Sequence, residues 1–171
     1  MRSDTDIALD LDLTLPGPKQ TDALGVALAG VLRPGDTLLL SGQIGAGKSH
    51  LARAIIQSLQ QRRDLPREDV PSPTYTLVQV YDLGDVEVWH ADLYRLNGAE
   101  DVFELGLDSA FETEICLVEW PDRLGQDAPA AALTVSLDLS PETVGRRVSI
   151  RATDPRWIAL ERQLTQLGNP S

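Results

Sequence analysis

The sequence is poor in cysteine and histidine. Cys116 is the only cysteine of the 171 residues, so the chain forms no internal disulfide, and we expect a reducing compartment. One cysteine and two histidines do not make a credible zinc site. Because Cys116 lies in the apolar run 115–118, we expect a packed strand residue rather than a reactive thiol.

Long apolar runs and excess positive charge are also missing. No stretch approaches the ~20 apolar residues of a membrane span. Residues 1–6 lack the basic and apolar regions of a signal peptide, so we expect a cytoplasmic protein without membrane association. The net charge of −11 argues against broad, unaided nucleic-acid binding, which needs a basic surface, but it allows a basic protein partner.

The remaining composition is that of an ordinary globular protein, with 42% hydrophobic and 24% charged residues. No repeat, low-complexity segment or linker divides the chain. We therefore predict one domain over residues 1–171, with loose termini at 1–6 and 168–171.

Apolar periodicity predicts the secondary structure. Strands are expected at 7–15, 37–41, 75–81, 86–91, 115–118, 133–139 and 148–150. Helices are expected at 24–32, 51–59 and 157–167, with short helical segments at 99–105 and 109–111. The turn at 82–85 indicates one hairpin, and the last two strands indicate a second. This mixture predicts an α/β fold: a mixed β-sheet flanked by helices, with antiparallel hairpins.

The most informative motif is the phosphate-binding loop (P-loop) G-x-x-x-x-G-K-[ST] at Gly42–Ser49. It lies between a predicted buried strand and a predicted helix, as its mechanism requires. Glycines let backbone amides close around a polyphosphate, and the helix end adds positive potential. Lys48 can reach the terminal phosphates, and the Ser49 hydroxyl can ligate Mg²⁺. The loop predicts ATP or GTP binding by Ile44, Gly45, Ala46, Gly47, Lys48 and Ser49.

Two carboxylates follow predicted strands. Glu119 ends the buried run 115–118 and is a candidate for organising the metal, with a plain surface acid as the alternative. Asp92 follows the predicted strand 86–91. It is a candidate for positioning water or for a metal-linked role, with a helix cap or a salt bridge to Arg95 as the alternatives. His90, on the same strand face as Asp92, is expected to be a hydrogen-bonded core histidine.

The segment Ser72-Pro73-Thr74 places hydroxyls on a loop whose prolines restrict the backbone. NTPases with a phosphate-binding loop often have a γ-phosphate-sensing switch in this interval. An ordinary proline-stiffened turn is the alternative.

Four segments in order resemble the TsaE family, the YjeE-type P-loop ATPases of tRNA threonylcarbamoyladenosine biosynthesis. They are the phosphate-binding loop, Ser72–Val78, His90–Leu96 and Cys116–Pro121. The resemblance runs from about residue 15 to 121 and more loosely to 150. It implies a P-loop NTPase-like α/β fold and a Mg²⁺-dependent ATPase with slow intrinsic hydrolysis. In the family, hydrolysis becomes useful in a complex with the TsaB–TsaD heterodimer, so tRNA is contacted indirectly.

The resemblance also implies roles for individual residues. Lys48 would hold the β- and γ-phosphates, and Ser49 with Glu119 would organise Mg²⁺. Asp92 would support hydrolysis, and Thr74 would belong to the switch. Pro18 and Arg146 are similar to positions that approach the nucleotide in the family.

Three positions depart from the family pattern. Gln43 replaces a common acid, Ser49 a common threonine and Ala91 a frequent aromatic residue. Serine keeps the hydroxyl that ligates Mg²⁺, whereas Gln43 removes any role that needs a carboxylate.

Three other functions are open from the residues alone. A P-loop small-molecule kinase usually needs an arginine-bearing lid, and neither Arg62-Arg63 nor Arg146-Arg147 lies in an obvious lid. A regulatory GTPase usually reads guanine through N-K-x-D, which the sequence lacks. A nucleotide-controlled regulatory binding protein remains as the third.

Overall fold

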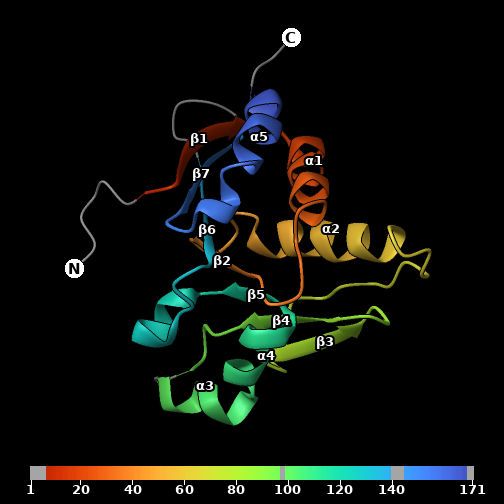
Figure 1. Cartoon of the computed structure of the whole chain (residues 1–171), viewed down its shortest axis with the longest axis vertical. Coiled ribbons are helices and arrows are strands. Elements are labelled where there is room, and N and C mark those ends of the chain that lie inside the picture. Colours follow the sequence, from red (N-terminus) through yellow and green to blue (C-terminus); the bar gives the residue numbers. More distant parts are fainter. Residues whose placement is uncertain (1–6, 97–98, 140–144, 169–171) are drawn as a thin grey trace.

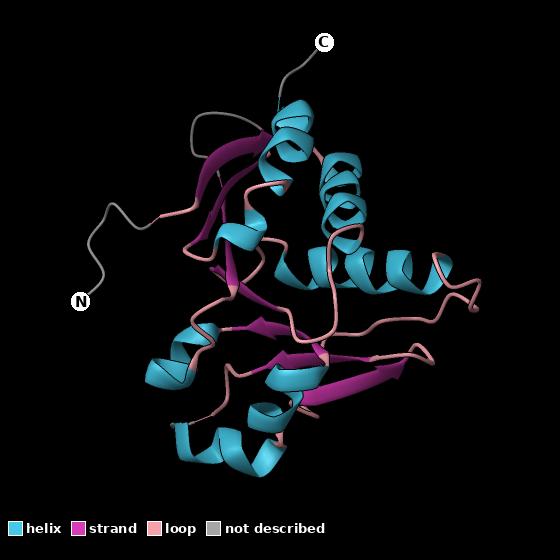
Figure 2. Cartoon of the chain, in the orientation of Figure 1, coloured by secondary structure: helices cyan, strands magenta, loops and turns pink. Residues whose placement is uncertain are grey.

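The computed structural model describes residues 7–96, 99–139 and 145–168. Its strands are β1 Leu9–Leu15, β2 Thr37–Gly42, β3 Val78–Asp82, β4 Glu87–Asp92, β5 Ile115–Glu119, β6 Leu133–Leu139 and β7 Arg146–Ala152 (Figures 1 and 2). Its α-helices are α1 Pro18–Ala29, α2 Lys48–Gln61, α3 Ala99–Leu105, α4 Leu107–Thr113 and α5 Leu160–Gly168. Two 3₁₀ segments, η2 Pro121–Asp127 and η3 Pro155–Trp157, complete the described elements.

The described strands form one seven-stranded mixed sheet in the order β1-β7-β6-β2-β5-β4-β3. Strand β2 pairs in parallel with β5 and β6, and β5 pairs in parallel with β4. Both predicted hairpins are confirmed, because β3 and β6 pair antiparallel with β4 and β7 respectively. The parallel centre brings the carboxyl ends of β2, β4 and β5 to one edge of the sheet.

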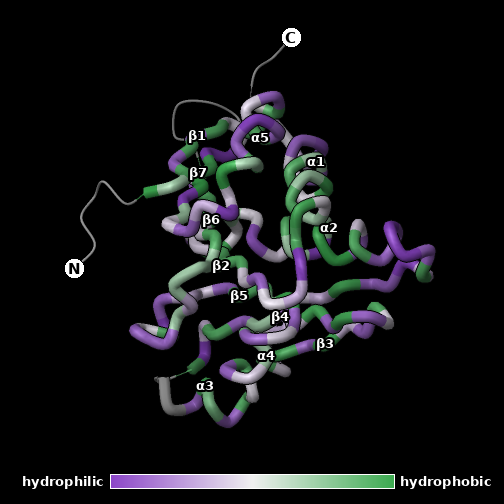
Figure 3. The backbone as a smooth tube through the Cα atoms, viewed as in Figure 1, coloured by the Kyte–Doolittle hydropathy of each residue, from purple (hydrophilic) through white to green (hydrophobic). Residues whose placement is uncertain are grey.

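Two hydrophobic cores lie between the sheet and the helices that pack on it. The larger one lies under α1, α2 and α5 and includes Leu24, Ile55 and Leu164. The smaller one lies on the opposite face of β4 and β5, under α3, α4 and η2, and includes Ala91 and Cys116. Both faces of β5 are therefore buried, which confirms its prediction as a fully buried strand. The turn at 62–64, which follows α2, is strongly hydrophilic in Figure 3.

The predicted strand at 75–81 is wrong at its start. A turn occupies this position, closed by a 2.7 Å hydrogen bond from the Leu77 amide to the Pro73 carbonyl. Leu77 has a φ of 68°, and strand β3 begins only at Val78. Apolar alternation continues through Thr74–Leu77, so the sequence pattern contains no sign of this turn.

The first and the last predicted helices begin at residues other than those predicted. The first begins at Pro18, where proline fits because the first helical turn needs no amide donor. It ends at Ala29, earlier than predicted. The last is divided: Asp154 caps η3 by accepting a hydrogen bond from the Arg156 amide, and α5 begins at Leu160.

The predicted loose termini fall mainly on residues 1–6 and 169–171, which lie outside the described residues, while Gly168 is the last residue of α5. Assignment of the whole chain to one domain stays a prediction. Within the described ranges, every helix is too short or too polar to cross a bilayer.

Candidate functional site

The phosphate-binding loop connects β2 to α2, as predicted. Gly42, Gly45 and Gly47 have φ values of 141°, 82° and 108°, a region that favours glycine. Gly42 has a second constraint, because a Cβ there would lie 2.2 Å from the Leu137 carbonyl oxygen of β6. Among the described residues, no side chain caps the start of α2, so its first amides remain available to an anion. Ile44 is exposed on this loop.

Lys48 lies with its amino group over the loop. Its Nζ donates hydrogen bonds to the carbonyls of Gly42 and Gln43 and lies 4.1 Å from the Trp120 ring centroid. Burial lowers the pKa of this amine, and the charges of Glu119 and Asp92 partly oppose that shift. A bound phosphate would favour the charged form further.

Glu119 receives hydrogen bonds from two directions. The Ser49 hydroxyl lies 3.0 Å from Oε1 and 3.2 Å from Oε2, and His90 Nε2 lies 2.7 Å from Oε2. Glu119 is the last residue of β5 and is only 2% exposed, which argues against a plain surface acid. The structure therefore brings together the two residues that the sequence predicts for Mg²⁺.

Asp92 lies beside Glu119, because the two residues are paired in the register of β4 and β5. Its Oδ2 lies 3.3 Å from Thr74 Oγ1, and its Oδ1 accepts a 3.0 Å hydrogen bond from the Tyr94 amide. The residue Ser72 adds a longer contact of 3.5 Å to Oδ2. The predicted switch and the predicted hydrolytic acid thus meet in space.

The proposed alternative partner of Asp92 is engaged elsewhere. No ion pair joins Arg95 to Asp92 within the described ranges, and the Arg95 guanidinium lies 5.4 Å from the Tyr75 ring centroid. The second alternative, a helix cap, is not seen: the Tyr94 amide donates a hydrogen bond to Asp92, but residues 94–95 form a turn and α3 begins only at Ala99.

Arg146 and Pro18, the two remaining residues predicted to approach the nucleotide, lie at different distances from the loop: Arg146 contacts it and Pro18 does not line the cleft beside it. Arg146, at the start of β7, donates from Nε to the Ala46 carbonyl at 2.7 Å and from Nη2 to the Gly45 carbonyl at 3.4 Å. Pro18 is exposed at the start of α1 and does not line the cleft beside the loop. One turn later, Asp22 lies 2.8 Å from His50 of α2.

A cleft of about 400 Å³ lies between the phosphate-binding loop and the carboxylates at the ends of β4 and β5. Besides the loop it is lined by Thr74, Asp92, Tyr94, Glu119 and Trp120. The rings of Tyr94 and Trp120 lie 4.9 Å apart between centroids, so the cleft has an aromatic wall beside its polar floor.

The donor set in this cleft suits Mg²⁺. The ion prefers oxygen ligands and usually combines one or two protein groups with phosphate and water. The hydroxyl of Ser49 and the carboxylate of Glu119 supply such oxygens. No group of three or more His, Cys, Asp or Glu side chains that could hold a metal occurs in the described part of the chain. The oxygens of Ser49 and Glu119 would fit a metal whose other ligands come from phosphate and water.

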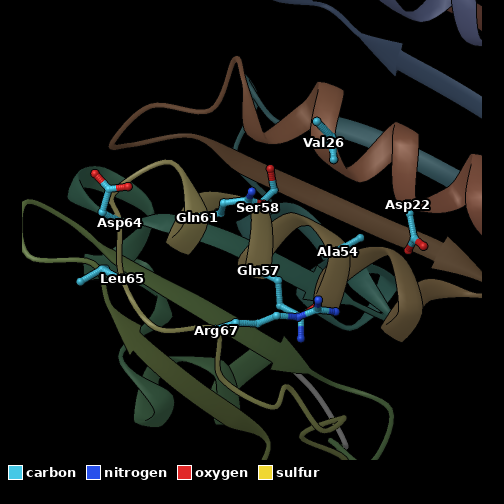
Figure 4. Close-up of a pocket in the computed structure, with 9 residues that line it drawn as sticks. All are labelled: Asp22, Val26, Ala54, Gln57, Ser58, Gln61, Asp64, Leu65 and Arg67. Atoms are coloured by element: carbon cyan, nitrogen blue, oxygen red, sulfur yellow. The ribbon is translucent and has the colours of Figure 1, made fainter.

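A separate hollow of about 640 Å³ lies beside α1 and α2 (Figure 4). Its wall includes Asp22 of α1, Gln57 of α2, and Asp64 and Arg67 of the following loop. Two of its three charged side chains are carboxylates, which repel phosphate, and it contains no residue of the phosphate-binding loop. The chemistry therefore favours the smaller cleft.

The contact between His90 and Glu119 is the feature that the sequence did not predict. His90 was expected to be a hydrogen-bonded core histidine, and its full burial agrees with that. Its partner depends on the register between β4 and β5, which the sequence does not contain. The one sequence feature that indicated a place near the site was the position of His90 on the same strand face as Asp92.

The sequence model of one family, described as threonylcarbamoyl adenosine biosynthesis protein TsaE, matches residues 15–148. The tRNA threonylcarbamoyladenosine biosynthesis protein TsaE of Rickettsia felis is 32% identical over 130 residues, which is 76% of this chain and 74% of that protein. The protein of the same name from Bacillus subtilis is 30% identical over 155 residues, 90% of this chain and 93% of that one.

The fold is similar to the crystal structure of Bacillus subtilis YdiB, with a TM-score of 0.70 and 23% identity. That similarity covers 95% of this chain and 98% of the other. It confirms the predicted α/β fold.

Proposed function

The chain belongs to the TsaE family, and on that premise we propose that it binds and hydrolyses ATP in the biosynthesis of threonylcarbamoyladenosine in tRNA. One observation carries the proposal. The phosphate-binding loop, the Ser49–Glu119 contact and the Thr74–Asp92 contact all line the same cleft.

Nucleotide binding is assigned to the loop and to Lys48. Amides at the start of α2 hold the phosphate oxygens, and the Lys48 ammonium contacts the β- and γ-phosphates. Arg146 supports the loop from outside by holding the carbonyls of Gly45 and Ala46. Because these carbonyls then point away from the phosphates, the loop can present its amides inward.

Metal binding is assigned to Ser49 and Glu119. When bound there, Mg²⁺ neutralises part of the negative charge that develops on the phosphate oxygens. The Ser49 hydroxyl and the Glu119 carboxylate, which meet at the end of β5 beside the loop, would hold the ion.

Hydrolysis is assigned to Asp92, and Thr74 is assigned to the switch that holds or releases this carboxylate. A carboxylate at the carboxyl end of β4 can accept a hydrogen bond from water and orient it for attack on the γ-phosphorus. The Thr74 hydroxyl now donates to this carboxylate at 3.3 Å. Movement of the 72–77 turn would release Asp92 to the water, which gives the turn its proposed switch role.

We assign stimulation of this activity to the TsaB–TsaD heterodimer. The acidic chain, with a net charge of −11, is suited to contact tRNA through those partners rather than by itself. A cytoplasmic location, predicted from the sequence, belongs to the same proposal.

The test measures ATP hydrolysis with and without purified TsaB–TsaD. We expect slow turnover by the chain alone and a clear stimulation by the pair. Lys48→Ala should abolish ATP binding, whereas the matched variant Lys19→Ala, which changes an exposed lysine of α1, should keep it.

Three results would contradict the proposal: no stimulation, unaltered binding by Lys48→Ala, or phosphate transfer to a metabolite instead of water. The last result would favour the small-molecule kinase. ATP binding that regulates partner docking without stimulated turnover would favour the regulatory binding protein.

A further inference from the structure

His90 is the most deeply buried polar side chain beside the cleft. It is 0% exposed on β4, and its Nε2 lies 2.7 Å from Glu119 Oε2 on the neighbouring β5. Its other ring nitrogen, Nδ1, has no hydrogen-bond partner among the described residues. The ring therefore makes a single polar contact, and that contact is to the proposed metal ligand.

A buried histidine with only one of its two ring nitrogens hydrogen-bonded does not favour the stability of the folded state. Burying an unpaired ring nitrogen destabilises the folded state, and an apolar side chain at this position would avoid that penalty. The neighbouring position on the same face, two residues earlier, is Val88, which is also fully buried. A polar ring after Val88 makes sense if its contact with Glu119 has a function.

The contact restricts where the Glu119 carboxylate can point. Ser49 Oγ is within hydrogen-bond distance of both carboxylate oxygens, at 3.0 and 3.2 Å, and so does not fix their orientation. His90 contacts Oε2 alone, which leaves Oε1 directed toward Ser49. A carboxylate held in this way presents one oxygen to the metal position beside the loop.

From this geometry we infer that His90 is a positioning residue that orients Glu119 for Mg²⁺ in the nucleotide complex. The inference rests on the proposed function, because it assigns a role toward the metal of that same site. Groups that hydrogen-bond metal ligands typically change metal affinity by about 10–100-fold when removed. His90 acts through Glu119 and touches neither nucleotide nor metal itself.

The experiment compares His90→Leu, which fills similar space without a donor, with His90→Gln, which keeps an N–H donor of similar reach. ATP binding is measured by calorimetry in excess EDTA and again in saturating MgCl₂, and the ratio of the two Kd values gives the enhancement by Mg²⁺. The half-saturating Mg²⁺ concentration for ATP hydrolysis is measured in parallel. Val88→Ala serves as the matched control for altered packing on the same strand face.

We expect His90→Leu to bind ATP normally in EDTA but to lose about 10-fold of the Mg²⁺ enhancement. His90→Gln should recover most of it. Val88→Ala should lower the unfolding temperature and keep the enhancement.

An unchanged enhancement in His90→Leu would overturn the inference, as would equal losses in His90→Leu and His90→Gln. Failure of the proposed function is distinguishable, because the unaltered protein would then bind ATP in neither condition. If His90→Leu does not fold, the comparison of His90→Gln with Val88→Ala decides: a loss of enhancement greater in Val88→Ala than in His90→Gln overturns the inference.

Discussion

At the scale of single residues, two adjacent carboxylates in the cleft have different hydrogen-bond partners. Asp92 and Glu119 are paired across two parallel strands, so their like charges lie close together. Glu119 is held by Ser49 and His90, whereas Asp92 is held by Thr74 and the Tyr94 amide. This division supports one carboxylate for the metal and one for water.

Substitution of Asp92 tests that division. Asp92→Asn should lower partner-stimulated kcat about 100-fold, because an amide is a poor acceptor for the proton of water. The ATP Kd and its Mg²⁺ dependence should stay unchanged. Steady-state hydrolysis and calorimetry measure both quantities, with Asp108→Asn in α4 as the control. An unchanged kcat would leave Asp92 with a structural role only, as the acceptor of hydrogen bonds from the Tyr94 amide and Thr74.

Cys116 gives a second prediction at this scale, on pH. Burial, assisted by the Glu114 charge, raises the pKa of this thiol from 9.0 to about 12. The folded chain therefore keeps the thiol proton when the unfolded chain loses it. Stability from this group is complete below pH 9 and falls as the pH rises toward 12, by up to about 1.4 kcal/mol per pH unit.

Urea unfolding between pH 8 and about pH 11 measures this slope. Cys116→Ala should be less stable at pH 8 because of the cavity, but its stability should fall less steeply with pH. Identical slopes in both proteins would contradict the raised pKa. A thiol reagent should also fail to label native Cys116, as the prediction of a packed residue requires.

Much of the site could be predicted from local patterns. The phosphate-binding loop is contiguous, and Glu119 and Asp92 each follow an apolar strand, so sequence spacing was sufficient for them. The contacts of His90 and Arg146 depend on strand register and on a partner 100 positions away in sequence. No local pattern contains that information.

At the scale of elements, the C-terminal segment is tied to the strand that carries the phosphate-binding loop. Arg156 of η3 donates from Nε and Nη2 to the Asp36 carboxylate and from Nη2 to the Val31 carbonyl. The guanidinium also lies 3.9 Å from the Trp157 ring centroid. Asp36 directly precedes β2, so this contact anchors α5 near the start of that strand.

Loss of this anchor should be costly. Arg156→Met should destabilise the fold by about 2–4 kcal/mol, because it leaves the mostly buried Asp36 without its cation. Arg151→Met, which breaks an exposed pair with Asp10, should cost less than about 1 kcal/mol. The midpoint of urea unfolding measures both. Similar losses in the two variants would contradict an anchoring role.

Element boundaries were the part of the fold that sequence reasoning predicted least well. Strong periodicity gave the type and order of the elements, including both hairpins and the buried β5. The turn before β3 was missed because Leu77 adopts a φ of 68°. A positive φ is uncommon for leucine, so the sequence did not indicate it. The η2 segment Pro121–Asp127 was not predicted.

At the scale of the whole molecule, charge is the property that most limits partners. With 26 acidic and 15 basic residues, the chain has little means of releasing counterions from a polyanion. The free chain should therefore not retard tRNA in a gel at ~0.15 M salt. With TsaB–TsaD present, any retardation should come from those subunits. Tight binding of tRNA by the chain alone, weakening steeply with salt, would contradict this prediction.

The pairing of β1 with β7 has a consequence for the order of events during synthesis. Leu9 is opposite Ala152, so β1 leaves the ribosome long before its strand partner β7 exists. Strands β2 to β5 can assemble in the meantime, but Arg146 reaches the phosphate-binding loop only with β7. The nascent chain thus contains the whole loop sequence long before it gains the loop's outer support from Arg146.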